Sequence, residues 1–163
     1  MKKLIQTLLF VTLCSFLYGQ NKKIPSVELK DINGKTFNTS DIDTNGLTII
    51  SFWATWCGPC KRELNTMHDL YLNWRENKNV TFIAVSIDDQ KTVRSVPMYV
   101  NAKGWEYLVL LDTNGDFKRL MGVNNIPHTF LIDQKGDIVY SHNNYTYGDE
   151  IIFDEMIKKL TKK

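Results

Sequence analysis

The sequence predicts an α/β fold in which a central mixed β-sheet is flanked by helices on both faces. Continuous apolar runs at 47–54 and 80–87 are typical of strands buried on both sides, and a helical pattern over 61–76 separates them. A hairpin pattern over 129–142 and a closing helix follow, and this order favours helices packed against a sheet. The length of 163 residues suits one domain.

The chain begins with a pattern typical of a secretory signal peptide. Lys2-Lys3 forms a basic start, residues 4–18 are mostly apolar, and Gly19 is a small residue suited to a cleavage position. We therefore expect residues 1–19 to be a cleavable signal peptide and residues 20–163 to form the folded domain. A retained membrane anchor is the alternative, although the apolar stretch is short for a span.

Cleavage would simplify both the cysteine inventory and the charge. It would remove Cys14, where lipid attachment is disfavoured because the bulky Leu13 precedes it, and leave Cys57 and Cys60 as the two cysteines. A secreted chain with all its cysteines in one CxxC motif uses them for chemistry rather than as a scaffold. The remaining 18 basic and 18 acidic residues argue against nucleic acid or an anionic membrane as a partner.

The first half of the domain reads as a hairpin, a strand and an amphipathic helix. Residues 24–37 alternate around Asn33-Gly34, a pair typical of tight hairpin turns. Ser40-Asp41 is suited to capping a brief helical turn. The helix after the strand at 47–54 has a buried stripe spaced by three and four residues, made by Cys60, Leu64, Met67, Tyr71 and Trp74.

The second half adds shorter elements. A helical pattern over 90–102 contains Pro97, which we expect to kink or split it. Residues 107–111 read as a short strand and 112–116 as a plain turn, and two strands flank Lys135-Gly136 as a hairpin. The closing helix is predicted to bury one face, made by Phe153, Met156, Ile157 and Leu160.

The most informative motif is Cys57-Gly58-Pro59-Cys60, which lies where the buried strand gives way to the helix. A cysteine at a helix N-terminus has its thiolate stabilised by free backbone N–H groups and by the helix dipole. Gly58 leaves room for a partner chain, and Pro59 suits the first helical turn because it lacks an N–H. The motif predicts a dithiol/disulfide redox device.

Two other interpretations of the motif are a zinc site and a structural crosslink. Structural zinc needs a second pair of ligands, and the three histidines lack the spacing of a zinc finger. A disulfide that closes so short a loop stabilises little through chain entropy. Redox chemistry is therefore the favoured interpretation.

The ordered set of motifs resembles the secreted TlpA/ResA-type branch of the thioredoxin-fold thiol-disulfide oxidoreductases, which overlaps with the AhpC/TSA redoxin superfamily. The resemblance runs from Ile24-Pro25 through 52–60 to 126–133 and covers essentially all of the chain after residue 19. It implies a thioredoxin-like fold with an N-terminal β-hairpin and a short central insertion at about 88–105.

The resemblance also implies roles for individual residues. Cys57 would be the attacking thiolate and Cys60 the resolving thiol of a redox-active disulfide, with exchange through a mixed disulfide. The Ile126-Pro127 bond would be cis and would present backbone to a substrate strand. The expected substrate-binding residues are Trp56, Gly58, Pro59, Ile126 and Pro127.

Two positions refine the pattern. Ser51 stands where cytoplasmic thioredoxins carry a buried Asp, so the strand lacks that carboxylate. Glu63, one helical turn after Cys60, matches a Glu of the ResA-like branch and could relay a proton for Cys60. Its alternative is an ordinary solvated charge. His128 stands where the family commonly has Thr, and a structural role is favoured; His68 and His142 carry no signal.

These observations predict a periplasmic disulfide reductase. The Gly-Pro pair is that of thioredoxin, a reductant, and the insertion is too short for a DsbA-like helical domain. A thiol peroxidase is disfavoured because Ala54 stands where peroxiredoxins place Thr, and a Sco-like copper protein because such proteins need CxxxC and a distant His.

The partners follow from this function. We expect substrate proteins with disulfides, a monomeric chain, and no nucleic acid, cofactor or metal. A reductase outside the cytoplasm also needs electrons from a membrane donor, which the family resemblance implies is of the DsbD/CcdA type.

Overall fold

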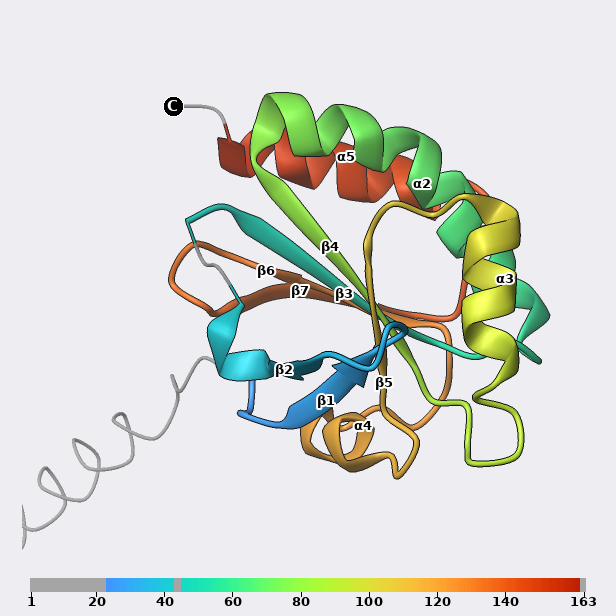
Figure 1. Ribbon diagram of the computed structural model, residues 1–163. Helices are drawn as coiled ribbons and strands as arrows, with labels where there is room; N and C mark the ends of the chain where they lie inside the picture. The colour runs from blue at the N-terminus through green and yellow to red at the C-terminus, as the bar shows by residue number, and fades with distance from the viewer. Residues whose placement is uncertain (1–22, 43–44, 162–163) are drawn as a thin grey trace, which may run out of the picture.

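The computed structural model describes residues 23–42 and 45–161, which form a seven-stranded mixed sheet with the strand order β2-β1-β5-β4-β3-β6-β7 (Figure 1). The predicted signal peptide, residues 1–19, and with it Cys14, lies outside the described residues. Among the described helices, none is both long and apolar enough to cross a membrane.

The N-terminal hairpin is confirmed. β1 (Glu28–Asp31) pairs antiparallel with β2 (Thr36–Asn38), and Gly34 in the turn has φ +83°, a conformation that favours glycine. The short helical turn that follows, η1 (Thr39–Asp41), is capped by the side chain of Asn38, which accepts from the Ser40 N–H, rather than by Ser40-Asp41.

The predicted central strands form the middle of the sheet. β3 (Leu47–Trp53) is buried along its whole length and runs parallel to β4 (Val80–Ser86), which runs parallel to β5 (Leu108–Leu111). On the other side, β6 (His128–Ile132) runs antiparallel to β3 and to β7 (Ile138–Asn143). The carboxyl ends of β3 and β4 therefore meet at one edge, where the cysteines follow.

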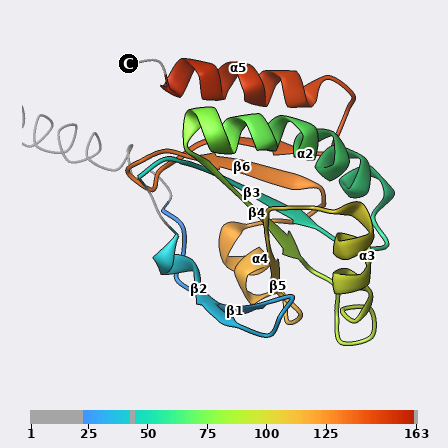
Figure 2. The ribbon, with the colours of Figure 1, turned by 45° about the horizontal axis from the view of Figure 1, so that its top comes forward.

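Helices cover both faces of this sheet, as expected (Figure 2). The long α2 (Gly58–Lys78), α3 (Ser95–Lys103) and α5 (Asp149–Thr161) share one core layer, which includes Ile49 and Trp53 of β3. The short α4 (Asp116–Met121) packs on the opposite face against a second layer. Because strand side chains alternate, Ser51 points to the same face as α2 and α5.

Three details differ from the sequence expectation. The helix expected over 90–102 begins only at Ser95, so Pro97 lies in its first turn, where its missing N–H costs nothing, and makes no kink. α4 begins where a plain turn was expected to end. On α5, Phe153 and Ile157 are buried as predicted but Leu160 is 42% exposed.

Candidate active site

The two cysteines are presented by the first turn of α2. Cys57 is the N-cap residue, and its Sγ accepts a hydrogen bond from the backbone N–H of Cys60 at 3.2 Å. The two sulfur atoms form a disulfide, with the Cα atoms 5.4 Å apart. Cys57 keeps 6% of its surface exposed whereas Cys60 has none, so only Cys57 is open to a partner. Both sulfurs also lie at the positive end of the helix dipole.

The residues around Cys57 form an open surface. Trp56 is 62% exposed, and a Cβ added at Gly58 would find no atom closer than 3.7 Å, on the Arg62 guanidinium. Gly58 therefore fills no packing role and leaves free space beside the disulfide. Exposed Met98 of α3 lies with Trp56 along a shallow apolar depression, which is lined by Thr55, Trp56, Ser95, Met98 and Tyr99.

The predicted cis peptide bond between Ile126 and Pro127 is present just before β6. The carbonyl oxygen of Ile126 lies 4.0 Å from the Sγ of Cys57. The Pro127 carbonyl accepts from the backbone N–H of Asn144 at 2.9 Å, which ties this loop to the end of β7. The residues expected to contact substrate, which are Trp56, Gly58, Pro59 and Ile126-Pro127, therefore all lie around Cys57.

A buried carboxylate that the sequence analysis did not single out fixes the loop before the motif. Asp88, at the end of β4, is fully buried and accepts hydrogen bonds from the backbone N–H and the hydroxyl of Thr55, at 2.8 and 2.5 Å. It also accepts from the Ser86 hydroxyl at 2.8 Å. Thr55 is two residues before Cys57, so these bonds hold the chain that leads into the cysteines.

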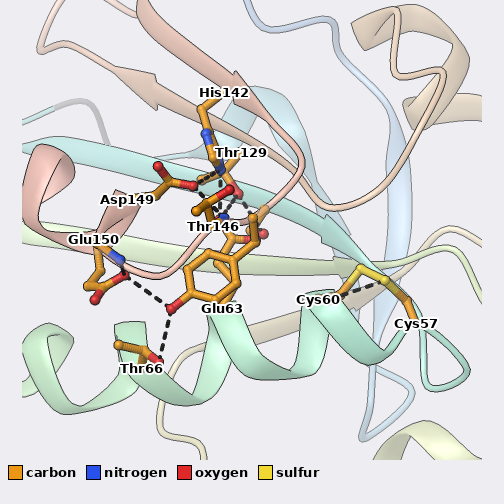
Figure 3. Close-up of polar contacts among 12 residues, drawn as sticks. Cys57, Cys60, Glu63, Thr66, Thr129, His142, Thr146, Asp149 and Glu150 are labelled. Carbon is orange, nitrogen blue, oxygen red and sulfur yellow. Dashed lines mark hydrogen bonds and ion pairs between the residues drawn. A yellow bond between two sulfur atoms is a disulfide. The ribbon is translucent and has the colours of Figure 1, made fainter.

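Glu63 is fully buried, unlike an ordinary solvated helix charge. Its Oε1 accepts from the hydroxyl of Thr129 on β6 at 2.9 Å, and the same hydroxyl lies 2.8 Å from that of Ser51 on β3. The carboxylate that is missing from β3 at Ser51 is thus supplied from α2. Figure 3 shows the residues that surround Glu63, with the Cys57–Cys60 disulfide at the start of the same helix, α2.

Burial changes the acidity of Glu63. Loss of water around the carboxyl raises its pKa from the ordinary 4.5 to about 8, against a lowering by the Thr129 hydrogen bond. The nearby Asp149 and Glu150 add to the rise through charge repulsion. The other oxygen, Oε2, has no hydrogen-bond partner among the described residues. A buried carboxyl that titrates near neutral pH is suited to carrying protons.

His142 joins this cluster, a placement that no sequence pattern predicted. Its Nε2 lies 3.8 Å from Oε1 of Glu63 and 3.6 Å from Oδ2 of Asp149 at the start of α5 (Figure 3). Loss of water lowers the pKa of His142, and the charge of Asp149 opposes this. Strand pairing explains the placement, because His142 of β7 is the register partner of Thr129.

The other two histidines lie elsewhere. His128 stacks on the ring of Phe130 with 4.3 Å between ring centroids, and His68 meets the edge of Tyr107. These contacts agree with a structural role for His128. Within residues 23–42 and 45–161, no group of three or more His, Cys, Asp or Glu side chains is arranged to hold a metal ion.

Comparison with known proteins gives consistent matches. The sequence pattern of the AhpC/TSA family matches residues 20–141. The chain is 30% identical over 140 residues to the thiol-disulfide oxidoreductase ResA of Bacillus thuringiensis subsp. konkukian, an alignment that covers 86% of this chain and 78% of that protein.

Solved structures agree. A thioredoxin-like protein from Porphyromonas gingivalis is 44% identical, with a TM-score of 0.74 over 85% of this chain and 91% of that one. A thiol:disulfide interchange protein from Chlorobium tepidum TLS shares the fold at 23% identity, with a TM-score of 0.72 over 88% and 99% of the two chains.

Proposed function

The chain belongs to the AhpC/TSA family and is a ResA-like thiol-disulfide oxidoreductase, and from this premise we propose that it is a disulfide reductase working outside the cytoplasm. The observation that carries the proposal is the asymmetry of the two sulfurs. Cys57 is partly exposed at the helix N-terminus beside the Ile126 carbonyl, whereas Cys60 is fully buried.

This asymmetry supports an order of events. The Cys57 thiolate attacks a substrate disulfide, forms a mixed disulfide and releases one substrate sulfur as a thiolate. Cys60 then loses its proton and attacks the Sγ of Cys57, which releases the second substrate thiolate. The substrate gains two electrons and the protein ends with the Cys57–Cys60 disulfide.

Glu63 is the proposed acceptor for the Cys60 proton. It lies one helical turn from Cys60 on the same buried face of α2, and its raised pKa allows it to take and return a proton near neutral pH. We expect Glu63→Gln, which keeps the shape but cannot accept the proton, to slow exchange about a hundredfold at pH 7. Stopped-flow exchange against a model disulfide measures the rate. Unaltered rates of Glu63→Gln across pH 5 to 9 would show that Glu63 does not accept the Cys60 proton.

The direction of electron flow is proposed from the Gly58-Pro59 pair. These residues place no charged side chain between the cysteines, so the thiolate receives little extra stabilisation and the couple should be reducing. We expect a potential within a few tens of millivolts of about −270 mV. Equilibration against glutathione, followed by Trp56 fluorescence, measures it, and a value near about −120 mV would make the protein an oxidant instead.

The partners and location complete the proposal. A reductase outside the cytoplasm needs electrons from the membrane, for which a DsbD/CcdA-type donor is suited, and its substrates are proteins with disulfides. Cys60→Ser should trap mixed disulfides through Cys57 in the native cell, whereas Cys57→Ser should trap none. Rapid turnover of hydrogen peroxide would favour the peroxidase alternative.

The signal peptide proposal has its own test. We expect the secreted protein to begin near Gln20, as the pattern of residues 1–19 predicts. Intact-mass analysis of the protein from the periplasm determines the first residue. A full-length or lipid-modified chain would contradict cleavage without affecting the chemistry proposed for the cysteines.

A further inference from the structure

A buried proton carrier needs a way to exchange its proton with water. In the proposed function, on which this inference rests, Glu63 takes a proton from Cys60 in each turnover and must lose it again. Glu63 is fully buried, and so is Cys60 once the disulfide has closed. The two sulfurs therefore give Glu63 no open path to solvent on their side of the cluster.

The cluster offers a path on its other side. Nε2 of His142 lies within 4 Å of both the buried Glu63 and Asp149, and it has no hydrogen-bond partner among the described residues. Exposure increases along this line of three groups, since the side chains of Glu63, His142 and Asp149 are 1%, 11% and 22% exposed. Asp149 is fixed at the surface by the backbone N–H of Thr146, which donates to its Oδ2 at 2.7 Å.

We propose that His142 and Asp149 form the proton exit of Glu63. After Cys60 has transferred its proton to the Glu63 carboxylate and formed the disulfide, the Glu63 carboxyl passes that proton to Nε2 of neutral His142. The resulting imidazolium gives the same proton to Asp149 or to water beside it, and both side chains return to their starting states. Re-reduction of the disulfide uses the path in reverse. His142 touches no reacting sulfur and acts on the reaction only through Glu63.

The surrounding charges fit a transient imidazolium. The titratable groups around this cluster are Glu63 from α2, Asp149 and Glu150 from α5, and three phenols, which belong to Tyr107, to Tyr140 on β7 and to Tyr145 in the following loop. The Glu150 carboxylate accepts from the Tyr145 hydroxyl at 3.1 Å and from the Gly148 N–H at 3.1 Å. Acidic groups around His142 favour a passing positive charge, whereas its burial returns the ring to the neutral form.

The test separates proton release from sulfur chemistry. The reduced protein is mixed with an excess of an aromatic disulfide whose thiol leaving groups stay ionised across the pH range tested, so that the Cys60 proton is released to the buffer. Trp56 fluorescence follows disulfide closure, and a pH-indicator dye follows proton release. We expect His142→Gln to make proton release lag about tenfold behind closure and to slow steady turnover by a similar factor. Asp149→Asn, which keeps an oxygen for the Thr146 N–H, should produce a smaller lag. His68→Gln, a histidine of α2 that faces Tyr107, is the matched control and should behave as wild type.

The outcomes distinguish the two proposals. If Glu63→Gln slows closure but the dye and fluorescence traces of His142→Gln and Asp149→Asn superimpose from pH 5 to 9, Glu63 relays the proton by another path and the exit is overturned. If Glu63→Gln itself leaves closure unaltered, the proposed role of Glu63 fails. A purely structural effect of His142→Gln would slow closure and proton release together, with no lag, and would also overturn the exit. Should His142→Gln not fold, Asp149→Asn decides alone.

Discussion

Two buried carboxylates lie near the disulfide, and their surroundings differ sharply. Asp88 is fully buried at the end of β4, yet three donors from Thr55 and Ser86 reach its two oxygens within 2.8 Å. Glu63 is equally buried on α2, but only the Thr129 hydroxyl donates to it, and its Oε2 has no hydrogen-bond partner among the described residues.

The number of donors separates a structural carboxylate from one suited to chemistry. Burying a charge is costly unless hydrogen bonds replace the lost water. Around Asp88 the protein supplies those bonds and in return fixes the chain that leads to Cys57. Around Glu63 the protein supplies only one such hydrogen bond, so the neutral form of the carboxyl is favoured and its pKa rises to about 8. The same functional group thus fixes the chain at one site and, in the proposed function, transfers protons at the other.

The largest test of this comparison is the pH dependence of stability. Because the pKa of Glu63 is raised from 4.5 to about 8, the folded protein holds a proton that the unfolded chain has lost in this range. The free energy of unfolding should therefore fall as pH rises from about 5 to 8, by up to about 1.4 kcal/mol for each pH unit. Glu63→Gln, which does not titrate, should remove this slope. Urea unfolding of the oxidised protein at each pH measures it.

A matched control variant accompanies this measurement. Glu76→Gln changes an exposed carboxyl on the same helix and should leave the slope in place. If wild type and Glu63→Gln lose stability in parallel between pH 5 and 8, the neutral form of Glu63 is not favoured by folding, and the contrast with Asp88 disappears.

The second test removes the better-bonded carboxylate. Asp88→Ala leaves the Thr55 N–H and the hydroxyls of Thr55 and Ser86 without their acceptor in a buried site, which should cost about 3 kcal/mol of stability. Urea unfolding of the oxidised protein measures this loss. Asp69→Ala, at an exposed position of α2, is the control and should lie within about 0.5 kcal/mol of wild type. A loss as small as that of the control would show that these hydrogen bonds contribute little to stability.

Local patterns predicted most of the fold and the centre of the site. The continuous apolar runs gave β3 and β4 within a residue or two, and the helical stripe gave the buried face of α2. The CxxC motif at a strand–helix junction is itself a local signal. The resemblance to a known family added the cis bond at Ile126-Pro127, for which spacing alone offers no rule.

The rest of the site depends on contacts between distant segments. Asp88 meets Thr55 across 33 residues because β3 and β4 end at the same edge of the sheet. His142 reaches Glu63 because β7 pairs with β6 and α5 packs on α2. A lone Asp after a strand, or a lone His within one, has no pattern that identifies it. Such residues become predictable only once strand order and register are known.

The prediction with the smallest expected effect removes the single hydrogen bond that Glu63 accepts. Thr129→Val removes the hydroxyl that donates to Glu63 while keeping the side-chain volume, so the bond that lowers the Glu63 pKa is lost. The pKa of Glu63 should rise further above 8, by about one unit, which corresponds to about 1.4 kcal/mol. The pH at which the fall in stability ends should rise by the same amount.

Ser51→Ala is the matched control, because the Ser51 hydroxyl contacts the Thr129 hydroxyl. In this variant the end of the fall in stability should shift by only about a few tenths of a pH unit. A shift to lower pH in Thr129→Val would show that Thr129 accepts a hydrogen bond from neutral Glu63 instead of donating one to it. The bond would then favour the protonated form, and the difference between Glu63 and Asp88 would lie in the direction of their hydrogen bonds as well as in their number.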